Sequence, residues 1–194
     1  MIKKKLTQKI TEIAGEHISL TKEEHDYALT NELLSETASI SVIESDKLFE
    51  NAIIERFVKE TEELISKESN AFLKTPITHF KEKMNEFMYL ETPHFETLSV
   101  DAIAFEYDEV FEVYTAMFGL SLQKKYGDAV KAYLNEHFDG KAMNYSVMFS
   151  AGDGLWEVNL PLNYIDDFDT NYTIEETYQF LYRFLFSLVA STEN

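Results

Sequence analysis

Two apolar-rich runs flank a Gly-Asp-Gly triplet, and their alternation predicts a β-hairpin with strands at 142–151 and 155–164. With Asp153-Gly154 as a two-residue type I′ turn, Phe149 lies opposite Val158. One face of the hairpin is then apolar and the other mostly polar, which is typical of a sheet with one buried side. The hairpin therefore requires a cover for its apolar face.

The exact pairing stays open at this point. A turn at Gly152-Asp153 shifts the pairing by two residues and leaves the same side chains on the same face, so both registers satisfy the pattern. Pro161 cannot donate to a neighbouring strand and places a sheet edge near the end of the second run. Residues 97–107 also alternate, with apolar side chains on both sides, and predict a strand buried on two faces.

Helical spacing dominates the first part of the chain. We expect a helix with one apolar stripe at its beginning, a second helix after a Thr21–Glu24 capping box, a long helix over about 46–73, and another from Thr75 onward. The stripe of the first helix consists of Ile2, Leu6, Ile10 and Ile13. The long helix rests on the rows Phe49, Ile53, Phe57 and Ile54, Val58, Ile65.

In the second part, residues 108–120 fit either a helix or a strand, and a short helix follows that ends near Gly140. The last helix begins at Thr173, with Glu176 completing a second capping box. Its body, YQFLYRFLFSLV, is apolar nearly all round, so it is either central to a core or shared with another subunit.

The fold class is therefore α+β: a small antiparallel sheet (97–107, 142–151, 155–164) packed against several helices. We expect a single domain over 1–194, mostly helical in 1–92, with the sheet and the apolar C-terminal helix in 93–194. With 194 residues and 45% hydrophobic content, the chain can bury a proper core. The absence of cysteine excludes disulfides, thiolate metal sites and cysteine nucleophiles. No secretory signal and no apolar run of membrane-spanning length is found, which predicts a cytoplasmic protein without membrane association.

Charge is the strongest compositional signal. The formal net charge is −18, from 35 acids and 17 basic residues. Nucleic acids and anionic membranes are bound through Lys and Arg, so neither is an expected partner. Two intervals, from Lys83 to Lys124 and from Lys141 to Arg183, contain no lysine or arginine between their ends. These intervals either keep the protein soluble or form a face for a basic protein partner.

Few motifs carry chemistry. Gly-Asp-Gly is not followed by Lys-Ser/Thr and is explained by the hairpin turn. Asp167, Asp169 and Asn171 have the spacing of the first ligands of a calcium loop and are the candidate metal ligands. Tyr172 and Tyr178 stand where such a loop requires glycine and glutamate, so the alternative is a polar loop before the Thr173 cap. Catalytic and cofactor-binding residues are not identified, and no cofactor is expected.

Three stretches, FGLSLQKKYGDAVKAYLNEHF, YSVMFSAGDGLWEVNLPLNYIDDF and EETYQFLYRFLFSLV, resemble small acidic proteins of unknown function from low-GC Gram-positive bacteria. Some of those carry the label branched-chain amino acid aminotransferase. The resemblance brings no catalytic motif. Such an enzyme needs a Schiff-base lysine and a phosphate-binding cup, usually with an arginine, whereas this chain has only Arg56 and Arg183 and no glycine-rich phosphate segment.

Three functions remain as hypotheses. The first is a non-enzymatic cytosolic protein that acts through protein–protein contacts, as a homo-oligomer. The second is an acidic inhibitor or immunity-type partner of a basic protein. The third is an enzyme or small-ligand binder whose site is assembled from distant residues, the aminotransferase label being one version of it.

Overall fold

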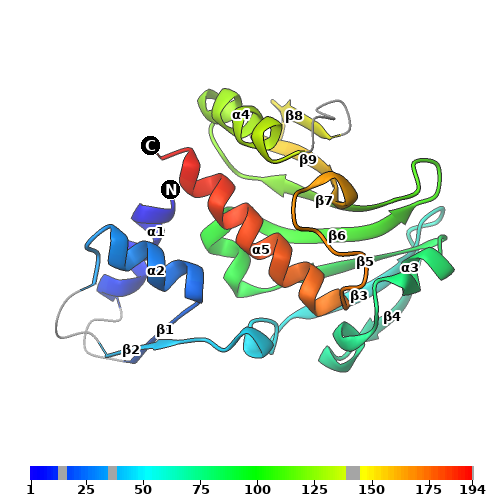
Figure 1. The fold of residues 1–194 in the computed structure, drawn as a ribbon, viewed down its shortest axis with the longest axis horizontal. Helices are drawn as coiled ribbons and strands as arrows, with labels where there is room; N and C mark the ends of the chain where they lie inside the picture. Colours follow the sequence, from blue (N-terminus) through cyan, green and yellow to red (C-terminus); the bar gives the residue numbers. More distant parts are fainter. Residues whose placement is uncertain (13–16, 35–38, 139–144, 194) are drawn as a thin grey trace.

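The computed structural model describes residues 1–12, 17–34, 39–138 and 145–193. It shows an α+β fold in which helices cover one face of a seven-stranded antiparallel sheet of order β4-β3-β5-β6-β7-β9-β8 (Figure 1). The strands are β3 Ile53–Val58, β4 Leu64–Glu68, β5 Glu86–Glu91, β6 Val100–Asp108, β7 Val113–Leu120, β8 Ser146–Ser150 and β9 Leu155–Pro161. The fold class predicted from the sequence is confirmed, with a larger sheet than expected.

The N-terminal region adds a smaller layer beside the sheet. Helix α1 (Ile2–Glu12) buries Ile2, Leu6 and Ile10 as the spacing predicted, whereas Ile13 lies outside the described residues. Strands β1 (His17–Leu20) and β2 (Ser39–Val42) pair in parallel and are joined through α2 (Lys22–Thr30). The Thr21–Glu24 capping box is present at the start of α2.

The prediction of one long helix over 46–73 is wrong. This stretch contains a 3₁₀ turn (Ser45–Lys47), strands β3 and β4, and a second 3₁₀ turn (Asn70–Lys74). The apolar rows predict one helix face, but in the structure their β3 members lie on both sides of the strand. Ile54 is buried in the core, while Phe57 stacks on Phe87 at the opposite face. Apolar residues on both faces of a strand also recur at spacings of three and four, which is why the pattern misled.

The helix expected from Thr75 onward is likewise reduced to α3 (Thr78–Glu82), and the chain then enters β5. The expectation that 1–92 is mostly helical is therefore wrong, because this part supplies three strands of the large sheet and both strands of the small one. The predicted strand 97–107 is β6, preceded by a 3₁₀ turn at Pro93–Leu98, and the open alternative at 108–120 resolves as strand β7.

The hairpin is present with the second of the two registers. Phe149 lies opposite Trp156 and Val147 opposite Val158, so the Phe149–Val158 pairing is wrong by two residues, although the side chains of β8 and β9 keep their predicted faces. The predicted second strand, 155–164, ends at Pro161, and Leu162–Tyr164 form a 3₁₀ turn. The loop comprises residues 151–154 instead of a two-residue turn. It is closed by a hydrogen bond from the Gly154 N–H to the Ser150 carbonyl, with Gly154 at φ 72°. Residues 142–144 of the predicted first strand lie outside the described residues.

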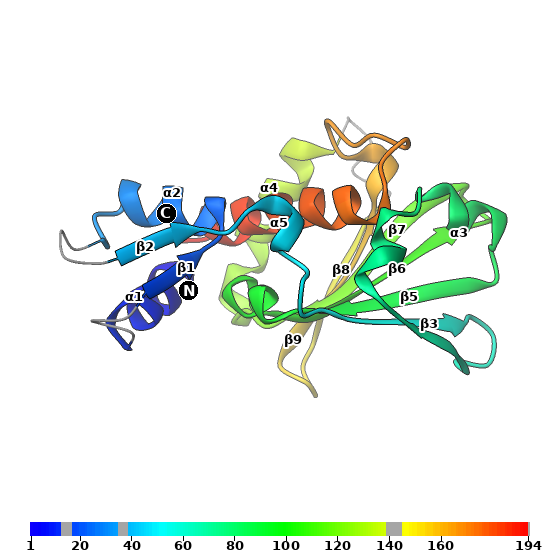
Figure 2. The same ribbon diagram turned by 90° about the horizontal axis from the view of Figure 1, so that it is seen from below.

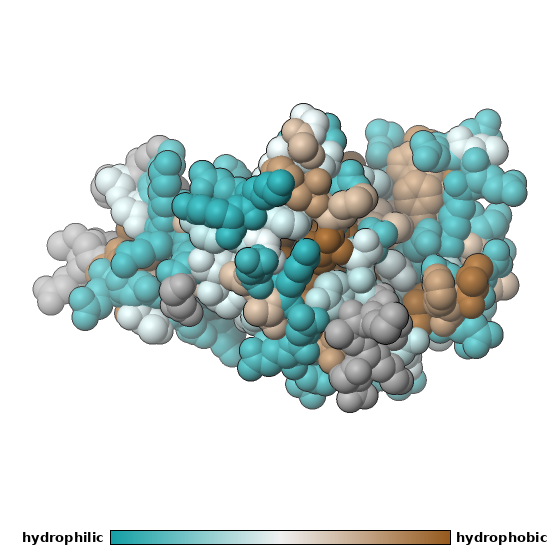
Figure 3. All heavy atoms as spheres, turned by 90° about the horizontal axis from the view of Figure 1, so that it is seen from above, coloured by the Kyte–Doolittle hydropathy of each residue, from teal (hydrophilic) through white to brown (hydrophobic). Residues whose placement is uncertain are grey.

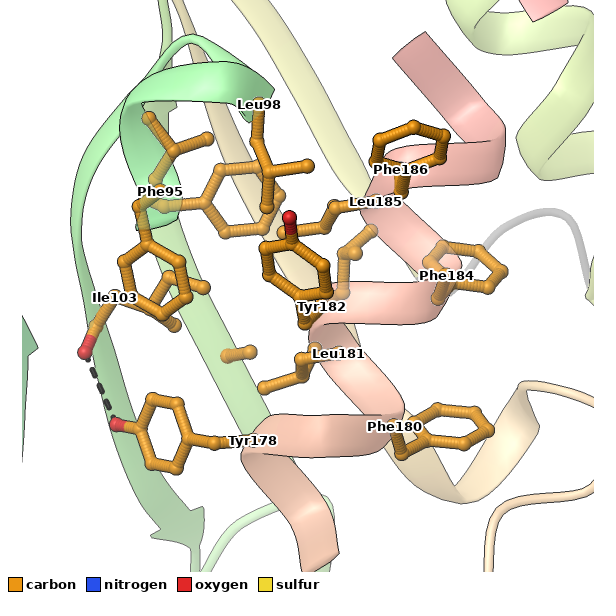
Figure 4. Packing of buried hydrophobic residues seen from close by; sticks show 14 of the residues in the cluster. Phe95, Leu98, Ile103, Tyr178, Phe180, Leu181, Tyr182, Phe184, Leu185 and Phe186 are labelled. Carbon is orange, nitrogen blue, oxygen red and sulfur yellow. Dashed lines mark hydrogen bonds between the residues drawn. The ribbon is translucent and has the colours of Figure 1, made fainter. Parts of the chain in front are cut away.

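Helix α5 (Ile174–Ser191) crosses one face of the sheet and explains why its sequence is apolar nearly all round (Figures 1 and 4). Its Thr173–Glu176 capping box is present. Tyr178 and Tyr182 point to the sheet side, and the Tyr178 hydroxyl donates to the Ile103 carbonyl at 3.0 Å. Phe180 and Phe184 point away from the sheet (Figure 4) but are also buried.

The outer side of α5 is covered from three directions. Tyr133 of α4 (Gly127–His137) contacts Phe184 at 5.5 Å between ring centroids, and Phe168 contacts Phe180 at the same centroid separation. Tyr27 of α2 meets Phe186 edge-on. The helix is thus central to the core, which was one of the two alternatives that its composition left open.

Candidate functional site

The two intervals without basic residues come together in the sheet. The first supplies β5, β6 and β7, and the second supplies β8 and β9. In the sheet these strands are consecutive, in the order β5-β6-β7-β9-β8. Acidic residues that are distant in sequence therefore share one continuous surface, and the strands themselves contain no lysine or arginine.

The helices use only one face of this sheet. Alternate side chains of a strand point to opposite faces, and Phe105 of β6 meets Phe80 of α3 and Tyr178 of α5, which fixes the helix-covered side. Figure 2 shows α4 and α5 on one side of the sheet, with no helix of the described residues over the other. We call that other side the uncovered face. Its principal residues, from the strand registers, are Ile53, Glu55, Phe57, Phe87, Tyr89, Glu91, Ala104, Glu106, Asp108, Thr115, Met117, Glu157, Asn159 and Met148.

An aromatic cluster occupies the β3–β5 part of the uncovered face. Phe57 stacks on Phe87 with centroids 5.3 Å apart, and Tyr89 meets Phe57 edge-on at 6.5 Å. Tyr89 is 44% exposed, and Ile53 on the same strand as Phe57 is 52% exposed. On β8, at the far side of the sheet, Met148 is 62% exposed. Large side chains left in water on one face are typical of a contact surface.

The charge of the uncovered face is negative. Lys67 pairs with Glu55 at 2.8 Å and Lys59 pairs with Glu106 at 3.3 Å, both near the β3–β4 end. Among the ion pairs of the described residues, none includes the exposed carboxylates of Glu91 and Glu157. The excess of negative charge therefore lies on the strands without basic residues.

The turn between β6 and β7 projects two apolar side chains at the rim of this face. Val110 is 79% exposed and Phe111 is 71% exposed, between the acids Glu109 and Glu112. Asp108 fixes the turn, because its Oδ1 accepts from the backbone N–H groups of Val110 and Phe111 at 2.9 and 3.0 Å. A capped turn of this kind presents its side chains in a defined position.

Beside this turn the uncovered face is hollowed. A cavity of about 320 Å³ is lined by the β6, β7 and β9 strands, the turn, and the segment that enters β8. Its lining residues are Glu106, Asp108, Phe111, Val113, Thr115, Met117, Tyr145, Ser146, Asn159, Pro161 and Tyr164. Aromatic walls and carboxylates are thus combined in one hollow, and the lining contributed by the described residues contains no lysine or arginine.

The side of the molecule seen in Figure 3 is mainly hydrophilic. Figure 3 shows hydrophobic residues only as separate patches among predominantly hydrophilic ones. A larger depression, of about 1280 Å³, lies between α2 and the end of α5. Its Tyr27 hydroxyl is already bound to Glu193 at 2.6 Å. This second depression carries charges of both signs, from Lys3, Lys4, Glu23 and Asp26, and so has no clear preference for a ligand.

The candidate calcium loop is tied by its own side chains. Asp169 Oδ1 accepts from both the backbone N–H and the side-chain amide of Asn171, at 2.8 and 2.7 Å. Asp167 has φ 64°, in the left-handed region. Over the residues that the structure describes, no group of three or more His, Cys, Asp or Glu side chains is placed to hold a metal ion. A metal site at Asp167, Asp169 and Asn171 stays a prediction without support from this geometry.

Elsewhere, buried ionisable groups bind one another. Glu24 is fully buried and accepts from Lys9 Nζ at 2.9 Å, the Thr97 hydroxyl at 2.5 Å and the Thr21 backbone N–H at 3.0 Å. Arg56 bridges Glu68 and Glu86 on the helix-covered face. The hydrogen bond from the Ser66 hydroxyl, followed by Arg56, holds the pKa of Glu68 below its ordinary value. The Glu24 network joins α1 and α2 to the 3₁₀ turn at Pro93–Leu98, and the Arg56 network joins β3, β4 and β5, so both have a structural role.

Sequence reasoning identified the acidic intervals but missed Tyr89, Phe111 and the hollow. The spacing after Thr75 predicts a helix that includes Tyr89, and Phe111 lies in the stretch 108–120, whose pattern fits either a helix or a strand. The signal available in the sequence was the alternation of Phe87 and Tyr89 with buried Met88 and Leu90.

The site thus belongs to an α+β protein with an antiparallel sheet, one face of which is left open, acidic and partly aromatic. Comparison with protein-family models, with curated proteins and with solved structures gives no match for this chain. Within the described residues, no helix has the length and apolar character needed to cross a membrane.

Proposed function

We propose that this protein acts through protein–protein contacts, as the acidic partner or inhibitor of a basic protein that docks on the uncovered face. The observation that carries the proposal is the run of strands β5-β6-β7-β9-β8, which has no lysine or arginine. Its open side carries exposed Tyr89 beside Glu91 on β5, and exposed Met148 on β8 opposite Glu157 on β9. Complementary charge accelerates association, and large exposed side chains supply most of the binding energy in such interfaces.

Self-association is less well supported at this face. Two copies placed face to face bring like charges together, which costs free energy in an interface. The apolar helix that suggested an oligomer is α5, whose Phe180, Phe184 and Phe186 are buried within the same chain. Homo-oligomerisation stays a prediction, and the uncovered face favours a partner of opposite charge.

The test begins with capture from source lysate at low salt, followed by binding measurements on each purified basic protein recovered. The variant Glu91→Gln/Glu157→Gln removes the unpaired charges of the uncovered face. The matched control Glu50→Gln/Glu136→Gln makes the same change of net charge at exposed positions outside this face. We expect the first variant to weaken binding about tenfold and to reduce the salt dependence of the dissociation constant, and the control to leave both nearly unchanged.

Tyr89→Ala is the apolar counterpart. Tyr89 is 44% exposed but packs edge-on against Phe57 and Phe87, so its loss should lower the free energy of unfolding by about 0.5–1.5 kcal/mol while weakening binding about tenfold or more. Equal effects of the two charge variants, or recovery of no basic protein at low salt, would overturn the proposal.

A further inference from the structure

The hollow at the β6–β7 end of the uncovered face combines features that select one type of chemical group. Its aromatic walls are Phe111, Tyr145 and Tyr164, its carboxylates are Glu106 and Asp108, and among the described residues that line it none is a lysine or an arginine. Aromatic faces and carboxylates both attract cations, and an aliphatic stem packs well between rings. We propose that this hollow is the socket for an organic cation, namely a lysine or arginine side chain of the docked partner.

The carboxylates have capacity for such a guest. Asp108 uses Oδ1 for the turn, accepting from Val110 and Phe111, and among the described contacts its Oδ2 has no partner. Glu106 meets Lys59 through Oε2, while Lys59 also donates to the Tyr107 carbonyl at 2.6 Å. Within the part of the chain that the structure describes, one oxygen of each carboxylate is therefore left for a guanidinium or ammonium group, and the pair retains a net negative charge beside Lys59.

The size of the hollow agrees with this guest. A volume of about 320 Å³ is at the lower end of the range for small-ligand pockets, roughly 300–1,000 Å³. It suits one side chain and is too small for a helix or a folded element. The lining also has an apolar part, which includes Met117, and an acidic part, formed by the two carboxylates on β6. This difference orients a guest side chain that has an apolar stem and a charged end.

This inference rests on the proposed function, since it names the group that the partner inserts. It can nevertheless be tested without the partner, using Nα-acetyl-arginine amide and Nα-acetyl-lysine amide as probes. The neutral control probe is Nα-acetyl-norleucine amide, which has a comparable aliphatic chain without the charge. Methyl NMR of the methionines supplies the readout, because Met117 lines the hollow and Met148 lies on the same face outside it.

We expect the arginine and lysine probes to produce saturable shifts at the Met117 methyl and little change at Met148, and the norleucine probe to produce neither. Asp108→Asn keeps an oxygen acceptor for the turn and removes the charge, and it should weaken binding of the cationic probes about fivefold or more. Glu157→Gln, the same loss of charge outside the hollow, should change this affinity less than twofold.

Equal shifts from the norleucine probe, or equal effects of Asp108→Asn and Glu157→Gln, would overturn the socket. A partner whose affinity falls for Tyr89→Ala but is unchanged for Asp108→Asn would also overturn it while supporting docking on the uncovered face. Saturable binding of the cationic probes at Met117 without any basic protein partner would support an organic-cation site and refute the proposed function.

Discussion

Gly127 at the start of α4 gives a sharp test of how tightly the sheet and helices are packed. A Cβ added at Gly127 would lie 2.2 Å from Cη2 and 2.5 Å from Cζ2 of Trp156. Carbon atoms in contact are normally about 3.5–4.0 Å apart, so the indole or the helix would have to move by more than about 1 Å. The backbone at Gly127 is ordinary helix, at φ −58° and ψ −38°, so the clash with Trp156 is the only obstacle to alanine.

Two opposing effects set the magnitude for Gly127→Ala. Alanine gains up to about 1 kcal/mol over glycine within a helix, and less at its first position. Overpacking a core costs about 1–3 kcal/mol and occasionally more. Trp156 is 5% exposed and held by Phe149 at a centroid distance of 5.1 Å, so it has little room to shift. We expect Gly127→Ala to lower the free energy of unfolding by about 1–3 kcal/mol.

Urea unfolding followed by circular dichroism measures this change, and fluorescence reports directly on the contact because Trp156 is the only tryptophan of the chain. Gly152→Ala is the matched control, since a Cβ there meets no atom within 4 Å, and it should be nearly neutral. In a Trp156→Phe background the penalty for Gly127→Ala should largely disappear. An undiminished penalty in that background, or a wild-type-like stability of Gly127→Ala itself, would refute the reasoning.

Three further changes have defined outcomes. Glu24→Ala should lower the free energy of unfolding, measured with urea, by about 3–5 kcal/mol, because it leaves the donors of Thr21 and Thr97 unpaired and Lys9 without its carboxylate. Glu24→Gln should lower it less, and equal losses for the two variants would contradict this account. Burial lowers the pKa of His94 in the folded protein below 6.5. The unfolded chain therefore takes up a proton at His94 at a higher pH than the folded protein does, and stability should fall as the pH drops below about 6.5. A native His94 that titrates at or above 6.5 in NMR would refute this. Tyr178→Phe should cost about 1 kcal/mol in urea unfolding through its lost hydrogen bond, and an unchanged stability would show that this bond contributes nothing.

Local signals in the sequence were the most reliable. Both capping boxes, at Thr21 and Thr173, form as predicted, because a cap is decided by side chains within the first turn of a helix. The alternation around Gly154 placed the side chains of β8 and β9 on the correct faces, since the period of a strand is fixed by its backbone. The register was not determined, because two turns gave the same parity.

The local sequence pattern did not determine that β3 and β4 are strands. Ile54 and Val58 fit a helix or a strand equally well by spacing, and the choice depends on pairing with β5, some thirty residues further along the chain. Tertiary pairing of this kind overrides local propensity, because a strand gains its hydrogen bonds and packing only once its neighbour is in place. The candidate site could not be predicted for the same reason, because Tyr89 lies on β5, in a segment whose spacing predicts a helix.

By itself, the sequence determined that the fold is α+β, that the last helix is apolar on nearly every side, and that two long intervals lack basic residues. Only the tertiary structure decided that these intervals form adjacent strands and that their acids share one open face with Tyr89, Phe111 and Met148. The reason is physical: composition and periodicity act over a few residues, whereas the arrangement of a surface depends on which distant strands pair and which side of the sheet the helices cover.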